Sequence, residues 1–150
     1  SEGASLGARG PRRRPWRMSL YVDASALLKH YVDEPDSDRF EQLFASDPVR
    51  VTGRHTIVEV RRNLARLLAP EVAAEMRAAF ADDARKLFLV DLDGPLCEEA
   101  AGIAELTGVR TLDALHLAAA RRVGDGVTLL TFDLRQAQAA RSLGLAVVGA

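Results

Sequence analysis

Residues 19–32 read Ser19-Leu20-Tyr21-Val22-Asp23-Ala24-Ser25-Ala26-Leu27-Leu28-Lys29-His30-Tyr31-Val32. A short apolar run is followed at once by a helix-forming run, and an acidic residue lies at the junction. Continuous apolar runs of this length are typical of strands that are buried on both faces of a parallel sheet. This stretch therefore predicts a strand followed directly by a helix, and the rest of the chain repeats that order.

Strand-like and helix-like segments alternate from residue 19 to the end of the chain. We expect strands at 19–23, 49–52, 87–90, 127–132 and 145–148, and helices at 25–32, 37–46, 55–68, 70–85, 94–106, 112–122 and 134–143. Pro70 separates two of these helices, and Gly108 and Gly144 each end another. The alternation predicts an α/β fold with a mostly parallel five-stranded sheet covered by helices on both faces.

The composition is that of a single domain with its own core. The chain has 150 residues, of which 48% are hydrophobic, and it contains no apolar stretch long enough to cross a membrane. Cys97 is the single cysteine, so no intrachain disulfide can form and a cytoplasmic location is expected. Aromatic residues make up only 5%, which argues against a surface that binds single strands by stacking on their bases.

Charge is distributed unevenly along the chain. Residues 1–17 contain five Arg and one Glu, are rich in Gly and Pro and lack periodicity, whereas residues 18–150 carry a net charge of −5. We expect residues 1–17 to be a disordered basic extension or a vector-derived remnant, followed by a domain at 18–150. A basic arm that grips RNA or a partner is the alternative.

Four acidic residues occupy positions where apolar residues or neutral caps would be expected. Asp23 and Asp133 follow two predicted strands, Glu59 lies within a predicted helix, and Asp113 opens a helix that is otherwise almost entirely apolar. A carboxylate in apolar surroundings is costly unless it is paired, neutralised or bound to a metal. The four acids together therefore predict one shared cation site.

Each acid also has a structural explanation. Asp23 could cap the following helix, although Ser25 could do so instead, and Asp133 could form a capping box with Gln136. Glu59 could form a surface ion pair with Arg62. Asp113 is the hardest to explain in this way, because its apolar helix should bury it. The helix dipole stabilises its negative charge by only about 0.3–1 kcal/mol, which is less than the cost of burying an unpaired carboxylate.

The donor atoms indicate the kind of cation. Oxygen-only ligands favour Mg²⁺ or Mn²⁺ over zinc. One cysteine and three scattered histidines, His30, His55 and His116, show no zinc-ligand spacing, and His116 is expected to be a hydrogen-bonded core residue. Asp91 and Asp93 follow another predicted strand and are expected to be structural.

The order of these motifs resembles the PIN-domain ribonucleases, and more narrowly the VapC toxins of VapBC toxin–antitoxin pairs. The matching pieces are Tyr21-Val22-Asp23-Ala24-Ser25-Ala26-Leu27, Thr56-Ile57-Val58-Glu59-Val60, Thr111-Leu112-Asp113-Ala114-Leu115-His116-Leu117-Ala118 and Thr131-Phe132-Asp133. The resemblance implies a small α/β/α sandwich that binds one or two Mg²⁺ or Mn²⁺ ions and cleaves structured RNA, such as tRNA or rRNA, with a metal-activated water. It also implies a VapB-like antitoxin partner and a homodimer.

The resemblance assigns a role to individual positions. Asp23, Glu59, Asp113 and Asp133 would be the catalytic and metal-binding acids, and Ser25 and Thr131 would support them. Four arginines near these acids could contact RNA phosphates: Arg61, Arg62, Arg110 and Arg135. A non-catalytic interaction module on the same fold is the alternative. A receiver-type phospho-acceptor domain fits less well, because neither Lys29 nor Lys86 follows the last strand.

Overall fold

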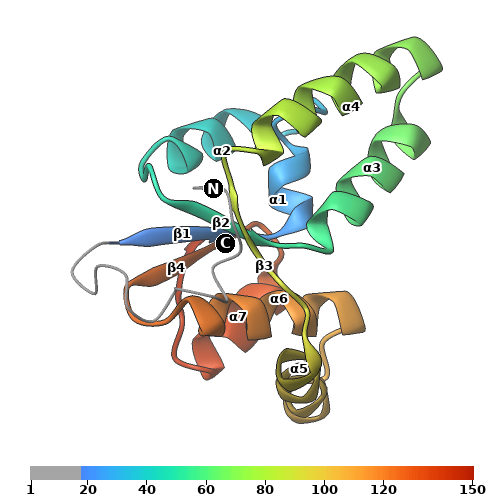
Figure 1. The fold of residues 1–150 in the computed structure, drawn as a ribbon. Helices are drawn as coiled ribbons and strands as arrows, with labels where there is room; N and C mark the ends of the chain where they lie inside the picture. Colours follow the sequence, from blue (N-terminus) through green and yellow to red (C-terminus); the bar gives the residue numbers. More distant parts are fainter. Residues whose placement is uncertain (1–17) are drawn as a thin grey trace.

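A computed structural model describes residues 18–150, and the predictions for residues 1–17 lie outside the described part. The sheet has five strands: β1 (Ser19–Val22), β2 (Arg50–Gly53), β3 (Phe88–Val90), β4 (Val127–Thr131) and β5 (Ala146–Gly149). Their order across the sheet is β3-β2-β1-β4-β5, and all four neighbouring pairs are parallel (Figure 1). The predicted α/β class with a parallel five-stranded sheet is confirmed.

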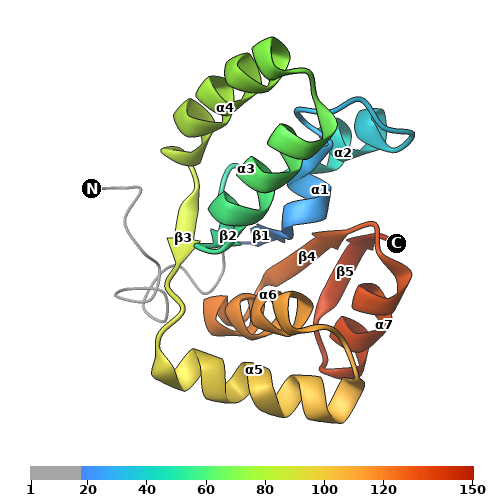
Figure 2. The same ribbon diagram turned by 90° about the vertical axis from the view of Figure 1, so that its right-hand side faces the viewer.

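Helices cover both faces of this sheet. Those in the described part are α1 (Ala24–Leu28), α2 (Ser37–Phe44), α3 (Thr56–Leu67), α4 (Pro70–Ala84), α5 (Gly94–Thr107), α6 (Thr111–Val123) and α7 (Leu134–Ser142). Helices α1 to α4 lie on one side of the sheet and α5 to α7 on the other (Figure 2). The result is a three-layer α/β/α sandwich, in which α3 and α4 form an antiparallel pair that extends away from the sheet.

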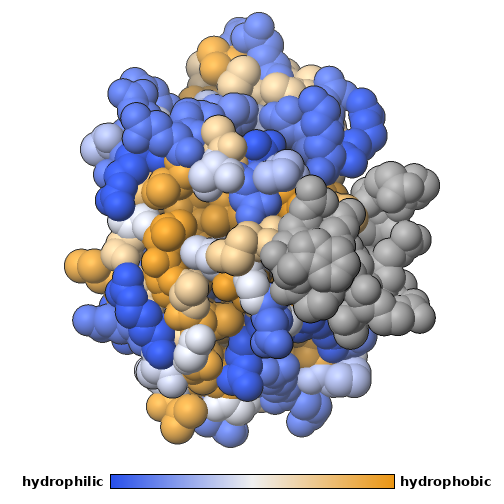
Figure 3. Space-filling view, turned by 90° about the vertical axis from the view of Figure 1, so that its left-hand side faces the viewer, coloured by the Kyte–Doolittle hydropathy of each residue, from blue (hydrophilic) through white to orange (hydrophobic). Residues whose placement is uncertain are grey.

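Each face of the sheet has its own hydrophobic core. Alternate residues of a strand point to opposite faces, so Tyr21 packs toward α5, α6 and α7 whereas Leu20 and Val22 pack toward α1 to α4. All four residues of β1 are buried, as expected for the central strand of a parallel sheet. A band of hydrophobic residues separates two hydrophilic regions at the height of the sheet on the face shown in Figure 3.

The strand order reverses at β1. The chain builds outward from β1 through β2 to β3 and then crosses to β4, which pairs with the other side of β1. In open parallel sheets, ligands bind beyond the carboxyl ends of the strands where the order reverses in this way. Here that point lies between β1 and β4, the two strands that precede Asp23 and Asp133.

Some local predictions were wrong. The helix expected at 112–122 begins one residue earlier, at Thr111, and Arg110 occupies the cap position without a side-chain cap bond. Leu67, the last residue of α3, is 44% exposed, because the end of this helix extends beyond the sheet. None of the helices within residues 18–150 is long and apolar enough to cross a membrane.

Candidate functional site

Asp23 is buried at the carboxyl end of β1. Its side chain caps α1, since Oδ1 accepts a hydrogen bond from the Ala26 amide at 2.9 Å and another from the Ser25 hydroxyl at 3.1 Å. Ser25 therefore orients the acid and does not replace it as the cap, which was one of the alternatives considered for this residue. Burial raises the pKa of the Asp23 carboxyl, and nearby His116 and Thr131 partly offset that rise.

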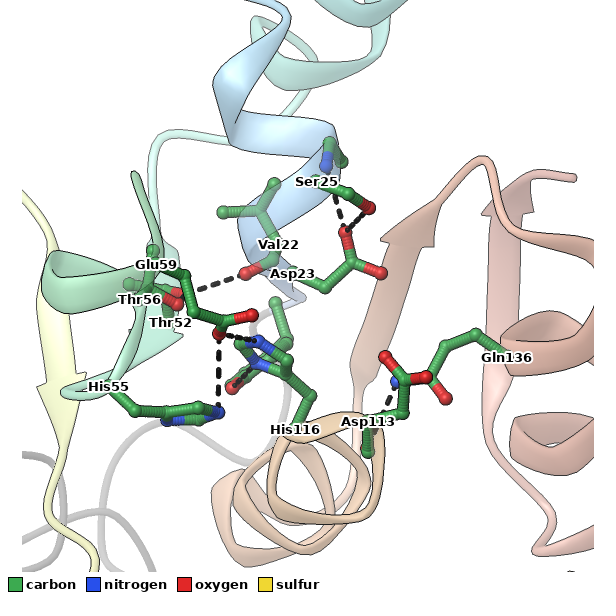
Figure 4. Close-up of polar contacts among 12 residues, drawn as sticks. Val22, Asp23, Ser25, Thr52, His55, Thr56, Glu59, Asp113, His116 and Gln136 are labelled. Atoms are coloured by element: carbon green, nitrogen blue, oxygen red, sulfur yellow. Dashed lines mark hydrogen bonds and ion pairs between the residues drawn. The ribbon is translucent and has the colours of Figure 1, made fainter. Parts of the chain in front are cut away.

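Glu59 lies in the first turn of α3 and reaches across to α6. Its Oε1 is 2.9 Å from Nε2 of His116, and the expected surface ion pair with Arg62 is not among the ion pairs of the described residues. Burial raises the pKa of the Glu59 carboxyl, and His55 opposes that rise. Glu59, which matches an acidic position of the family that the sequence resembles, is thus held in place by His116 from another helix (Figure 4).

His116 is a satisfied core histidine, as predicted, and it also lines the site. Its Nδ1 lies 2.7 Å from the hydroxyl oxygen of Tyr21, while Nε2 contacts Glu59. The ring of His55 packs against it with centroids 4.0 Å apart. Burial lowers the pKa of each of these two histidines to about 4, so both are neutral near pH 7.

Asp113 and Asp133 approach the site from α6 and from the start of α7. Asp133 caps α7, since Oδ1 accepts hydrogen bonds from the Arg135 and Gln136 amides at 2.8 and 3.1 Å. The predicted capping box is incomplete: Thr131 accepts from the Asp133 amide, whereas the Gln136 side chain donates to the Asp113 carbonyl at 3.1 Å. Gln136 therefore ties the two acid-bearing helices together (Figure 4).

Asp113 is less buried than its apolar helix suggested. It is half-buried, and the fully enclosed polar side chain of α6 is instead His116, one turn later. Burial raises the pKa of the Asp113 carboxyl, and the charges of Asp133 and Glu59 raise it further. This half-exposed position leaves the carboxylate accessible to a ligand.

Three of the four acids interact electrostatically, and Asp23 is linked to them through His116. Asp113 interacts with Glu59 and with Asp133, and Asp23 interacts with His116, which holds Glu59. Figure 4 shows the side chains of Asp23, Glu59 and Asp113 directed toward a common space beyond the end of β1. A cation would stabilise the charged form of Asp113, whose pKa the neighbouring acids raise, and carboxylate oxygen atoms suit a hard divalent ion.

The predicted arginines have different positions relative to this group. Arg110 and Arg135 lie close enough to lower the pKa of Asp113, and both side chains are exposed. Arg61 and Arg62 are exposed on α3. Asp93 is structural as predicted, because it caps α5 and forms two 2.8 Å bonds with Arg122.

Sequence reasoning missed the side chains that gather behind Glu59. His55 and Glu59 are four residues apart at the start of one helix, a local signal that was available, but His116 follows 57 residues after Glu59. The histidines are scattered in the sequence, but His55 and His116 lie side by side in the structure. The His55, Glu59 and His116 ligand atoms all lie within 4.8 Å of one another.

Comparison with known proteins identifies the family to which the chain is similar. A family model described as PIN domain matches residues 20–142. The chain is 34% identical over 131 residues to Ribonuclease VapC46 of Mycobacterium tuberculosis (strain ATCC 25618 / H37Rv), an alignment that covers 87% of this chain and 96% of that protein. Ribonuclease VapC35 of the same strain is 32% identical over 134 residues, covering 86% of this chain and 95% of its own.

Solved structures share the fold. The crystal structure of Mycobacterium tuberculosis VapC20, described as a sarcin-ricin loop cleaving toxin, superposes with a TM-score of 0.67 at 21% identity, covering 80% of this chain and 94% of that one. DNA-bound VapBC from Salmonella typhimurium gives a TM-score of 0.63 at 20% identity, covering 87% and 96%. At these identities the likeness supports the fold.

Proposed function

This chain belongs to the PIN-domain family, and on that premise we propose that it is a Mg²⁺- or Mn²⁺-dependent endoribonuclease, the toxin of a toxin–antitoxin pair. The observation that carries the proposal is the group of four carboxylates at the switch point of the sheet. Three of them, Asp23, Glu59 and Asp113, have raised pKa values, and Asp113 is linked to Asp133. The curated relatives named above are ribonucleases, which supports the same reading.

The residues present fit a hard divalent cation. Asp23, Glu59, Asp113 and Asp133 would hold it, because each offers carboxylate oxygen and because positive charge relieves the repulsion that Asp113 experiences from Asp133 and Glu59. When bound, such an ion activates water for attack on a phosphodiester and stabilises the charge that develops on the phosphate. Ser25 and Thr131 would support Asp23, since Ser25 donates to Oδ1 and Thr131 lowers its pKa.

The protein's own groups would position the substrate and receive a proton. The exposed Arg110 and Arg135 side chains flank Asp113, where they would contact the RNA phosphates on either side of the scissile bond. Arg61 and Arg62 on α3 would extend this contact. Asp113 is the candidate general base, because its half-exposed carboxylate is accessible to the attacking water.

Structured RNA, for example tRNA or an rRNA loop, is the proposed substrate class, and residues 18–150 form the proposed nuclease domain. A VapB-like antitoxin is the proposed inhibitor, with the cytoplasm as the site of action and a homodimer as the functional unit. Between α3 and α4 lies a cavity of about 470 Å³ that combines Ile57 and Phe80 with Arg61 and Arg77. Such a mixed apolar and basic cavity suits an amphipathic segment of a partner.

The decisive experiment is cleavage of labelled tRNA and of an rRNA hairpin by the purified full chain. Wild type should cleave with Mg²⁺ or Mn²⁺ and stop when EDTA is added, and Asp113→Asn should lose at least about 100-fold in rate, as when other preorganised catalytic groups are removed. Asp125→Asn is the matched control, because Asp125 is exposed in the loop before β4, at the opposite edge of the sheet. Cleavage that persists with EDTA and in Asp113→Asn would refute the mechanism.

The alternative is a non-catalytic interaction module on the PIN fold. It predicts no RNA cleavage by wild type under any metal condition and no toxicity when the chain is expressed without its partner. It also predicts that Asp113→Asn binds the partner as wild type does. Cleavage and toxicity that both disappear in Asp113→Asn would exclude this alternative.

A further inference from the structure

Behind the acidic group lies a second cluster with different chemistry. His55 at the start of α3, Glu59 one turn later and His116 of α6 bring two imidazoles and one carboxylate together, with all three ligand atoms within 4.8 Å of one another. The cluster adjoins the four acids but shares only Glu59 with them.

His55 points into this cluster and is not held there by a standard hydrogen bond to another described residue. Its side chain is 8% exposed, and neither ring nitrogen makes a hydrogen bond of standard geometry with another described residue. Its polar surroundings are the backbone of Leu112 and the Glu59 carboxylate, whose Oε1 is 3.8 Å from Nε2. A buried polar side chain without a hydrogen bond costs free energy, which indicates that its partner is a ligand.

The distances suit a transition metal. Tetrahedral coordination with bonds of about 2.0–2.1 Å places ligand atoms about 3.3 Å apart. From Oε1 of Glu59, the two Nε2 atoms lie at 2.9 Å for His116 and 3.8 Å for His55, values that bracket this separation. A small shift of the Glu59 side chain would equalise them, and that side chain is 20% exposed, so the cluster has an opening to solvent.

Tyr21 and Gly53 determine how the two histidine rings are oriented, and a metal-binding histidine needs such a fixed orientation. Nδ1 of His116 faces the Tyr21 hydroxyl at 2.7 Å, so in the tautomer that leaves Nε2 free to bind a metal, Nδ1–H donates to Tyr21. Gly53 leaves space for the His55 ring and the Tyr21 hydroxyl, because a Cβ at position 53 would lie 2.6 Å from Nδ1 of His55 and 2.9 Å from the Tyr21 hydroxyl oxygen. No larger residue at position 53 allows the present arrangement.

We propose that His55, Glu59 and His116 form a binding site for one Zn²⁺-class transition-metal ion. Two imidazole nitrogens and a carboxylate oxygen favour such an ion over Mg²⁺, and a three-ligand set leaves a coordination position for water. Zinc bound here takes up the carboxylate of Glu59, so it would inhibit magnesium-dependent cleavage. That consequence rests on the proposed function, but the site itself does not.

The test measures metal binding directly and uses the full chain after removal of metals. Zn²⁺ is titrated in competition with a chromogenic chelator, and Co²⁺ is added separately to record the visible absorption bands of a tetrahedral centre. Wild type should bind one ion per chain. His55→Leu and Glu59→Gln should each weaken Zn²⁺ binding by at least about 10-fold, because each removes a ligand.

Two control variants make the result specific. His30→Ala removes an exposed imidazole that follows α1 and contacts Glu41 and Asp83, outside the cluster, so it should bind Zn²⁺ as wild type does. Asp113→Asn removes an acid of the proposed magnesium site but no ligand of this cluster, so it too should keep its zinc affinity. Thermal denaturation confirms that each variant is folded.

The proposal fails if His55→Leu and Glu59→Gln both bind Zn²⁺ as tightly as wild type, or if His30→Ala weakens binding as much as they do. It also fails if Co²⁺ gives no tetrahedral spectrum with wild type. Loss of zinc binding in Asp113→Asn but not in His55→Leu would place the ion among the four acids instead. A chain that binds zinc at this cluster but cleaves no RNA would overturn the proposed function and leave this site intact.

Discussion

The charge of Asp23 should be needed for activity but not for stability, whereas its side-chain oxygen caps α1, and two substitutions separate these roles. Its Oδ1 accepts hydrogen bonds from the Ala26 amide at 2.9 Å and the Ser25 hydroxyl at 3.1 Å. An asparagine Oδ1 can accept both, and Asn caps helices about as well as Asp. Asp23→Asn therefore keeps the cap of α1, whereas Asp23→Ala loses it and should cost about 1 kcal/mol.

The charge of Asp23 adds a second effect. Burial raises the pKa of this carboxyl, so without metal the folded state disfavours its ionised form. The penalty is present at neutral pH and is relieved as the pH falls through the raised pKa. Asp23→Asn removes this penalty, so we expect the variant to be at least as stable as wild type at pH 7. At lower pH, where the Asp23 carboxyl of wild type becomes protonated, this advantage of the variant should disappear.

The assay is thermal denaturation of metal-free wild type, Asp23→Asn and Asp23→Ala, with RNA cleavage measured in parallel. Because the lost cap costs about 1 kcal/mol, the melting temperature of Asp23→Ala should lie about 2–4 °C below that of Asp23→Asn. Both variants should lose RNA cleavage. Mg²⁺ at 100 times its Kd should stabilise wild type by about 2.7 kcal/mol, with most of this lost in Asp23→Asn. An Asp23→Asn protein that is clearly less stable than wild type, or that still cleaves RNA, would refute the reasoning.

Three further predictions concern the residues behind the acids. Tyr21→Phe removes the hydroxyl that faces buried His116 at 2.7 Å and should cost about 1–3 kcal/mol in urea denaturation, more than Tyr31→Phe, whose hydroxyl partner is partly exposed. Gly53→Ala places a Cβ against His55 and Tyr21 and should cost about 1–3 kcal/mol by the same measurement, so an unchanged unfolding midpoint would contradict the packing described. Burial lowers the pKa of His55 from 6.5 to about 4, so the folded state loses stability relative to the unfolded state as the pH falls from about 6.5 toward 4. The free energy of unfolding of His55→Leu relative to wild type should therefore rise by about 2 kcal/mol between pH 7.5 and 5.0. A difference that stays constant over this range would exclude the lowered pKa.

The twelve helices and strands of the described part were predictable because their signals are local. Apolar runs such as Leu20-Tyr21-Val22 and the breaks at Pro70 and Gly108 report the conformation of their own neighbourhood, and alternation of strand and helix then implies a parallel sheet. The burial of Asp113 was overestimated for the same reason. Its helix is apolar nearly all round, but its first turn lies at the edge of the sheet, where the site opens.

The sequence by itself determined that an α/β/α sandwich forms and that four acids lie at or beside the ends of core elements. Only the tertiary structure decided which side chains meet, because the crossing from β3 to β4 brings together residues far apart in the chain. Glu59 contacts His116 and not Arg62, and Gln136 joins Asp113 and not the Asp133 amide. Such contacts depend on strand order and helix position, and no local pattern encodes them.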